Sequence, residues 1–127
     1  SVFSLENRLL WFLDILFARW PQVRPPDRRL ETAKIIAHRG IHDNVRTQEN
    51  TLAAFQRCAE VGIWGVELDV RWTKDGEAVV CHDPDLVRVF GIREQVHTLS
   101  FDQLRRRCPP VPSLTEVATA FGGQLHL

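Results

Sequence analysis

The chain has no excess of charge of either sign, because 16 Lys and Arg residues balance 16 Asp and Glu residues among its 127. Proteins that bind nucleic acids usually carry a basic excess, so we expect no nucleic-acid partner. Glycine and proline are scarce at seven residues each, which excludes a collagen-like or low-complexity chain. Hydrophobic residues make up 44% of the sequence. That share is enough for a packed core and excludes intrinsic disorder.

Cysteine is also scarce, with only Cys58, Cys81 and Cys108 present. Their odd number and wide spacing match neither a Cys-x-x-Cys metal motif nor an even disulfide framework. We expect buried or idle thiols in a reducing compartment. The start of the chain also lacks the features of a secretion signal. Together these absences favour a cytoplasmic location, including one at the periphery of a membrane.

The first 33 residues hold no apolar run long enough to cross a membrane. The run that starts at Leu9 is interrupted by Asp14, and it is shorter than the roughly 20 residues that a span requires. Within residues 5–20 the apolar side chains fall on one stripe of a helical wheel, and prolines from Pro21 onward end the helix. We therefore interpret residues 1–33 as an amphipathic helix and a Pro-rich linker. The helix either docks on the protein or a partner subunit, or lies on a membrane surface.

Residues 34–127 alternate between strand and helix signals, which predicts an α/β domain with a mainly parallel sheet. Capping boxes start the two later helices, and Asp75-Gly76 predicts a two-residue hairpin turn. The expected elements are a buried strand over 35–37, a helix over 51–60, a strand over 64–72, a return strand over 77–82, helices over 100–107 and 113–121, and a strand from 124.

Two carboxylates interrupt the apolar pattern of the strand over 64–72. Glu67 and Asp69 are two residues apart, so a continuous strand would place both on one face. Burying two like charges together is costly unless a cation lies between them. Paired carboxylates suit a hard cation, so we predict an Mg²⁺ or Ca²⁺ site. The alternative is a solvated acidic face on an edge strand.

The position of His82 follows from the predicted hairpin. If Asp75 and Gly76 are the central turn residues, Asp69 faces His82 across the two strands. A register slip of one residue would still leave His82 next to Asp69. His82 also ends a strand, where α/β proteins usually place their sites. We therefore predict a functional role for His82.

His38 and Arg39 occupy the matching position at the end of the preceding strand. Arginine is the usual bidentate ligand of phosphate, and histidine carries protons near neutral pH. Two histidines, an arginine and a carboxylate-bound cation are the groups required for phosphoester cleavage. One histidine would deprotonate the nucleophile while the other protonates the leaving oxygen. The cation and Arg39 would stabilise the charged transition state.

Several short stretches of residues 34–127 form a specific combination when taken in order. They are His38-Arg39-Gly40, Glu49-Asn50-Thr51 with Ala54-Phe55, Gly65-Val66-Glu67-Leu68-Asp69-Val70, Thr73-Lys74-Asp75-Gly76, Val79-Val80-Cys81-His82-Asp83 and Pro112-Ser113-Leu114-Thr115-Glu116-Val117. With these motifs the chain resembles the glycerophosphodiester phosphodiesterase family.

The resemblance implies a TIM-type (β/α)₈ barrel of the phosphatidylinositol-phospholipase-like kind. It also implies metal-dependent hydrolysis of glycerophosphodiesters to glycerol 3-phosphate and an alcohol, with a glycerol hydroxyl attacking first to give a cyclic phosphate. The resemblance assigns acid/base catalysis to His38 and His82, phosphate binding to Arg39, and a divalent metal (Mg²⁺ or Ca²⁺) to Glu67 and Asp69. We also expect Arg39, Glu49 and Asn50 to bind the substrate.

Three departures from the family pattern accompany this resemblance. Gln48 stands where proline is usual, and Arg88 is followed by Val89-Phe90 rather than by threonines. A third metal carboxylate is expected on the next strand, in a Glu-x-Lys motif that would follow Leu127. A complete barrel needs about 250 residues. We therefore expect residues 34–127 to be the N-terminal part of a longer barrel.

Two rival functions remain open at this point. The first is a lysophospholipase D-like lipid phosphodiesterase, which the amphipathic N-terminal helix would favour. The second is a non-catalytic barrel fragment that binds a phosphodiester or has a structural role. The missing third carboxylate favours that second alternative.

Overall fold

The computed structural model describes residue 23 and residues 26–127, and the chain divides into the units Ser1–Ala33 and Lys34–Leu127. In the first unit the described helix is α2, Asp27–Glu31. The amphipathic helix expected over residues 5–20 lies outside the described residues. No helix in the described part of the chain is long and apolar enough to cross a membrane.

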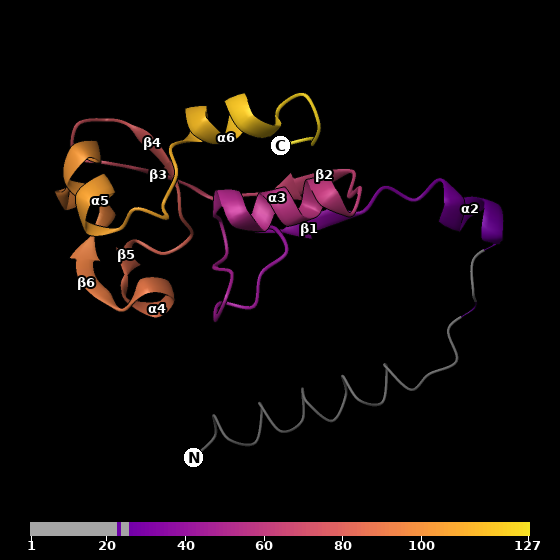
Figure 1. Cartoon of the computed structure of the whole chain (residues 1–127), viewed down its shortest axis with the longest axis horizontal. Helices are drawn as coiled ribbons and strands as arrows, with labels where there is room; N and C mark the ends of the chain where they lie inside the picture. Colours follow the sequence, from indigo (N-terminus) through magenta and orange to yellow (C-terminus); the bar gives the residue numbers. More distant parts are fainter. Residues whose placement is uncertain (1–22, 24–25) are drawn as a thin grey trace, which may run out of the picture. The chain divides into compact units, whose positions relative to one another are not determined.

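The second unit begins with a parallel strand–helix–strand motif (Figure 1). Strands β1 (Ile36–His38) and β2 (Gly65–Glu67) pair in parallel, with His38 opposite Glu67. Helix α3 (Leu52–Glu60) connects them, and the Thr51 side chain caps it by accepting a hydrogen bond from the Ala54 amide. The predicted helix over 51–60 is therefore confirmed within one residue. This connection places the carboxyl ends of both strands side by side.

The last residues of the chain lie against the other edge of β2. His126 forms a parallel bridge with Gly65, and its carbonyl accepts a hydrogen bond from Val66 at 2.8 Å. A Cβ atom at Gly65 would lie 2.7 Å from the His126 carbonyl oxygen, so only glycine allows this approach. The predicted strand from residue 124 is thus present as one bridge beside β2.

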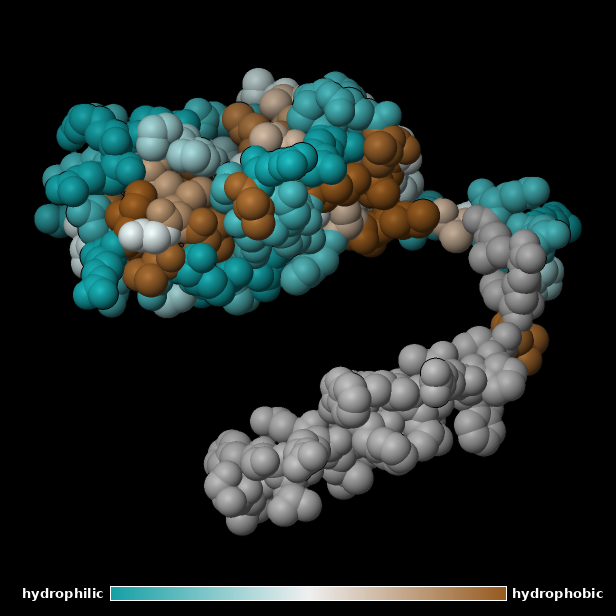
Figure 2. All heavy atoms as spheres, turned by 60° about the horizontal axis from the view of Figure 1, so that its bottom comes forward, coloured by the Kyte–Doolittle hydropathy of each residue, from teal (hydrophilic) through white to brown (hydrophobic). Residues whose placement is uncertain are grey.

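The expectation that the first strand is buried is wrong. Ile35 and Ile36 are 61% and 55% exposed. Residues alternate between the two faces of a strand, and here Ala37 packs against the hydrophobic core while Ile36 and His38 point to the other face. Residues of the described part of the chain leave that second face open, and Figure 2 shows hydrophobic patches on the surface of this unit.

The single strand expected over 64–72 is instead divided into two strands. The chain leaves β2 after Glu67 and begins β3 (Val70–Trp72), which pairs antiparallel with β4 (Ala78–Val80) in a separate sheet. Glu67 and Asp69 therefore do not share the face of one continuous strand. The alternation rule fails here because Leu68 and Asp69 belong to neither strand.

The predicted hairpin register is also wrong by one residue. Val70 pairs with Val80, so Asp69 lies opposite Cys81, whose amide donates to the Asp69 carbonyl at 2.9 Å. The reason is the turn, which contains three residues between Thr73 and Glu77 rather than two. Gly76 takes a φ of 81° at the last of these positions, as in a type I turn followed by a left-handed residue. His82 remains one residue from the position opposite Asp69.

A compact group of short elements follows the hairpin and was not predicted. They are β5 (Asp85–Leu86), α4 (Val87–Phe90), β6 (Ile92–Gln95) and the 3₁₀ helix η1 (Val96–Thr98). Elements of two to four residues are too short to show a periodic pattern. The capping boxes are confirmed, because Ser100 starts α5 (Phe101–Arg107) and Ser113 starts α6 (Leu114–Phe121).

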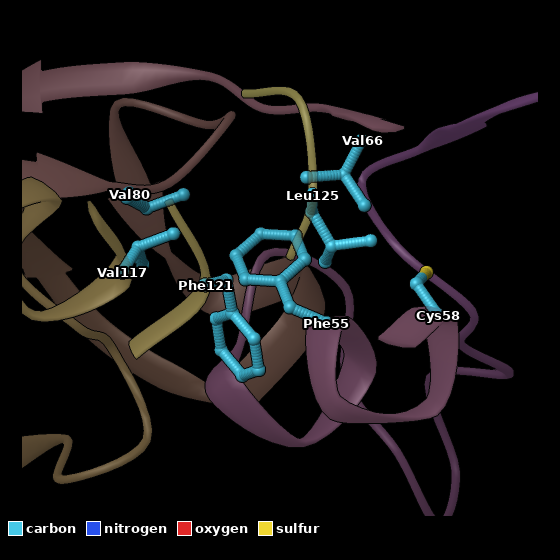
Figure 3. Packing of buried hydrophobic residues seen from close by; sticks show 7 residues of the cluster. All are labelled: Phe55, Cys58, Val66, Val80, Val117, Phe121 and Leu125. Carbon is cyan, nitrogen blue, oxygen red and sulfur yellow. The ribbon is translucent and has the colours of Figure 1, made fainter. Parts of the chain in front are cut away.

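Two hydrophobic clusters meet at β4. Val80 belongs to the first cluster, where Phe55 of α3 packs edge-to-face on Phe121 of α6 (Figure 3). Val79 belongs to the second cluster, with Leu86 and Leu104. Because adjacent strand residues point to opposite faces, β4 is covered on both sides. This fixes the strand that leads to His82.

The three cysteines are unpaired and buried, as the sequence predicts. Cys58 lies in the first cluster, and Cys81 and Cys108 lie in the second. Burial raises the pKa of Cys81 and of Cys108 to about 11. These thiols are therefore protonated at neutral pH, and they fill the core rather than react.

Candidate active site

His38 and Glu67 face each other at the carboxyl ends of β1 and β2. The His38 Nε2 atom lies 3.6 Å from the Glu67 Oε2 atom. Both side chains are open to solvent, with 69% and 47% of their surface exposed. The structure therefore brings together two of the predicted site residues, and it leaves both accessible to a ligand.

Arg39 follows His38 and turns back toward the domain. Its φ of 56° is unusual for a residue with a side chain, and the Asn50 amide secures the turn by donating to the Arg39 carbonyl at 3.0 Å. The Arg39 Nη1 atom donates to Glu49 Oε1 at 2.9 Å, and its Nε atom lies 3.1 Å from Asp69 Oδ2. Two carboxylates thus hold this guanidinium in place beside the strand ends.

Glu49 is the most buried carboxylate of the site, with 4% of its side chain exposed. It accepts hydrogen bonds from Arg39, from Arg88 at 2.6 and 3.0 Å, and from Asn44 at 2.7 Å. Mainly through the Arg88 hydrogen bonds, these donors hold its pKa at about 2, below the ordinary 4.5, although burial opposes them. Glu49 is therefore ionised across the physiological range.

Asn50 has a left-handed backbone, with φ 56°, and is also buried. Its side-chain Nδ2 atom donates to Asp69 Oδ2 at 3.0 Å. Its Oδ1 atom is buried and has no hydrogen-bond partner in the described part of the chain. A buried acceptor without a donor carries a free-energy cost, so it calls for an explanation such as a functional role, local strain or a bound water or ion. Substrate binding by Glu49 and Asn50 stays a prediction.

His82 lies two residues after the end of β4 and is held through its Nδ1 atom. That atom is 2.6 Å from Asp83 Oδ1, and Asp83 in turn accepts two hydrogen bonds from Arg88. Arg71 of β3 donates to the His82 carbonyl at 2.6 and 2.9 Å. The ring and the backbone of His82 are therefore both restrained.

These contacts form one continuous network. Asp83 connects to Arg88, Arg88 to Glu49, Glu49 to Arg39, and Arg39 to Asp69. Sequence reasoning missed Arg88 as a member of the site, because 39 residues separate it from Glu49. Its position after the His82-Asp83 motif was the only signal in the sequence.

The predicted metal site was tested against the donors that are present. Glu67 and Asp69 supply carboxylate oxygens, and the unpartnered Asn50 Oδ1 atom is a further oxygen next to Asp69. This chemistry fits a hard divalent cation. The described residues contain no group of three His, Cys, Asp or Glu side chains that could hold a metal. Glu67 and Asp69 are therefore a small set of carboxylate donors. Arg39 and Asn50 also occupy Asp69 Oδ2.

Comparison with known proteins decides the family. The model of the glycerophosphoryl diester phosphodiesterase family matches residues 38–125. The chain belongs to this family. The match begins at His38 and contains every predicted site residue, so the resemblance inferred from the motifs is confirmed.

Curated relatives carry the corresponding name. The chain is 43% identical over 72 residues to a glycerophosphodiester phosphodiesterase of Caldanaerobacter subterraneus, which is 57% of this chain and 29% of the relative. It is 38% identical over 103 residues to human glycerophosphodiester phosphodiesterase 1, which is 80% of this chain and 29% of the relative. The chain thus spans about 29% of the length of these relatives.

Solved structures of the family share the fold of the second unit. A glycerophosphodiester phosphodiesterase of Thermotoga maritima matches with a TM-score of 0.61 and 40% identity, over 67% of this chain and 37% of that one. A phosphodiesterase of Oleispira antarctica, in complex with the product sn-glycerol-3-phosphate, matches with a TM-score of 0.61 and 26% identity, over 72% and 41%. These matches support the prediction of a partial TIM-type barrel.

Proposed function

We propose that the complete protein hydrolyses glycerophosphodiesters to glycerol 3-phosphate and an alcohol, in a reaction that depends on a divalent metal. The observation that carries this proposal is the network that joins His82 to Arg39 and Asp69 in a chain of this family. A relative of the same fold holds sn-glycerol-3-phosphate, and this supports the choice of product.

Arg39 is the proposed phosphate ligand. Its Nη1 atom donates a hydrogen bond to Glu49. Its Nε atom lies within ion-pair distance of Asp69 but is buried and makes no hydrogen bond with the described residues. Because two carboxylates already fix this guanidinium, it loses little conformational entropy when a ligand binds. Its remaining N–H groups can donate to a phosphate oxygen. Arg39 would thus both bind the phosphodiester and stabilise the added charge of the transition state.

His38 and His82 are the proposed proton carriers. Asp83 holds the Nδ1 atom of His82, so the Nε2 atom is left for proton transfer. His38 keeps its Nε2 atom exposed next to Glu67. One of the two would take the proton of the attacking glycerol hydroxyl, and the other would give a proton to the leaving alcohol oxygen.

Glu67 and Asp69 would hold the divalent metal, together with groups outside the described residues. When bound, such a cation polarises phosphate oxygens and offsets the charge that develops on them. The exposure of Glu67 and the fixed position of Asp69 both support this assignment, since one carboxylate remains accessible and the other is already oriented.

The test is hydrolysis of glycerophosphocholine by the complete protein, followed by the release of glycerol 3-phosphate. We expect product in the presence of Mg²⁺ or Ca²⁺ and none in excess chelator. The matched control is the Arg93→Gln variant, which changes an exposed residue of β6 whose side chain makes no hydrogen bond or ion pair with the described residues. Absence of hydrolysis with either metal would contradict the proposal, as would full activity in excess chelator.

One observation favours a second candidate, a lipid phosphodiesterase of the lysophospholipase D type. A pocket of about 260 Å³ beside the His82 segment is lined by the apolar Val70, Trp72, Pro84 and Val96 and by the polar Arg71 and His97. Trp72 is 63% exposed, and an apolar surface of this kind suits an acyl chain. Turnover of a lysophospholipid without turnover of glycerophosphocholine would favour this candidate over the first.

A further inference from the structure

The guanidinium group of Arg88 donates most of its hydrogen bonds to two carboxylates. Its Nε and Nη2 atoms donate to the Asp83 carboxylate at 2.7 and 3.2 Å. Its Nη1 and Nη2 atoms donate to the Glu49 carboxylate at 3.0 and 2.6 Å. Four of its five N–H groups are therefore engaged, and little capacity remains for binding a phosphate directly.

This arrangement differs from an ordinary surface ion pair. Exposed pairs are weak because water competes for both partners and two flexible side chains must be ordered. Here Glu49 is buried, Asp83 is 19% exposed, and both contacts are bidentate. Bidentate Arg–carboxylate pairs fix the direction of the carboxylate as well as its distance. Arg88 therefore sets the orientation of both acids.

The orientation of Asp83 matters because of His82. The Arg88 hydrogen bonds, followed by that of His82, hold the pKa of Asp83 below its usual range. An ionised carboxylate can only accept, so the His82 Nδ1 atom at 2.6 Å carries a proton. In neutral His82 this fixes the tautomer with a bare Nε2 atom, the nitrogen that must exchange a proton with the substrate.

Arg88 also connects two parts of the unit that pack separately. It lies on α4, where the Asp85 side chain accepts from the Val87 amide and Gly91 ends the helix at φ 71°. Glu49 lies in the loop before α3, which belongs to the other hydrophobic cluster. The contact from Arg88 to Glu49 thus adds a link between these two parts at the site.

We propose that Arg88 is a positioning residue, which holds Asp83 so that His82 keeps one tautomer and one ring direction, and which ties this histidine to Arg39 through the shared carboxylate of Glu49. The inference deepens the proposed function and rests on it for the catalytic meaning of His82. The placement of the ring itself does not depend on that function.

The experiment compares Arg88→Gln and Arg88→Lys with the control Arg93→Gln in the complete protein. The first measurement is the ¹⁵N and ¹H signals of the His82 ring, which report the tautomer and the Nδ1 hydrogen bond without any substrate. We expect Arg88→Gln to weaken the hydrogen-bonded Nδ1 proton signal and to populate the other tautomer. Arg88→Lys keeps the charge but lacks the planar fork, so we expect a smaller change.

The second measurement is the steady-state hydrolysis of glycerophosphocholine. We expect Arg88→Gln to lower kcat by about 10- to 100-fold with little change in KM, since a misplaced catalytic group impairs the chemical step. Arg88→Lys should recover part of this loss, and Arg93→Gln should behave as the wild type. Circular dichroism establishes that each variant is folded, and if Arg88→Gln is not, Arg88→Lys alone decides.

Two results would overturn the proposal. The first is an unchanged His82 ring signal in a folded Arg88 variant, whatever happens to activity. The second is a raised KM with normal kcat, which would make Arg88 a substrate ligand. If the complete protein hydrolyses no phosphodiester, the proposed function fails, but the His82 signals still decide whether Arg88 positions the ring.

Discussion

The two histidines of the site have very different surroundings. The His82 half, made of His82, Asp83, Arg88 and Glu49, contains hydrogen bonds of 2.6–3.2 Å around a buried carboxylate. The His38 half, made of His38 and Glu67, has one 3.6 Å contact between two exposed side chains. The difference teaches that the described residues restrain one of the two proposed proton carriers through hydrogen bonds and leave the other exposed, with a single ion-pair contact.

The strands explain this difference. The strand that leads to His82 is covered on both faces, because Val79 and Val80 enter separate hydrophobic clusters. The strand that ends in His38 is covered on one face, through Ala37. Rigid support of a side chain requires packed neighbours. The His38 half therefore has less support from the described residues than the His82 half.

The largest expected effect is the loss of either histidine. His82→Ala and His38→Ala should each lower kcat by about 10²-fold or more, because each removes a proposed proton carrier. The two substitutions should differ in their effect on thermal stability. Because His38 is 69% exposed, we expect its loss to leave the melting temperature unchanged. His82→Ala removes a partner of Asp83 and lowers that temperature slightly. Kinetics and thermal melting of both variants check this, and a normal kcat for either one rejects its catalytic role.

The next prediction distinguishes residues proposed to bind the metal from residues proposed to act through His82. Glu67→Gln should raise the Mg²⁺ concentration for half-maximal activity by about tenfold or more, since it removes a proposed ligand. Asp83→Asn should lower kcat and leave that concentration unchanged, because the Asp83 carboxylate pairs with His82 and Arg88 and, among the described residues, with neither Glu67 nor Asp69. Metal titrations of both variants measure this. An equal shift in the two variants would show that the halves are not separate.

Glu49→Gln tests the stability of the His82 half. The substitution keeps the shape of the side chain but leaves Arg39 and Arg88 without their shared anion, so we expect the free energy of unfolding to fall by about 2 kcal/mol. The control is Glu60→Gln on α3, an exposed residue that accepts a single hydrogen bond from Gln56. Urea unfolding measures both, and equal losses would show that the buried network adds no stability.

Much of the fold follows from local signals in the sequence. The capping boxes at Ser100 and Ser113 were predicted correctly, because each depends on residues within one helical turn. The hairpin register was not, since Asp75-Gly76 fits both a two-residue and a three-residue turn. In the structure the longer turn is held by the Thr73 side chain, which donates to Asp75 and accepts from the Glu77 amide, and by the Gly76 amide, which donates to the Thr73 carbonyl.

Prediction of the site from the sequence was likewise limited to residues that follow a local pattern. The histidines, Arg39 and the two carboxylates were found because they end strands or repeat at a fixed spacing. The role of Arg88 depends on its contact with Glu49, 39 residues away in the sequence, which no periodic pattern encodes. The end of β2 after Glu67 was not predicted for a related reason, because the alternating pattern of residues 64–72 continues through it into β3.

The smallest expected effect is the pH dependence of the Glu49 contribution. The folded-state pKa of Glu49 is about 2, against an ordinary 4.5, so its stabilisation is complete above pH 4.5 and is lost as the pH falls toward 2. Other carboxylates titrate in the same window, so the informative quantity is the difference between wild type and Glu49→Gln. That difference should be constant from pH 7 to 5 and shrink below pH 4.5. Unfolding free energies at several pH values measure it, and a difference that stays constant down to pH 3 would show that Glu49 titrates normally and that the two arginines do not hold it.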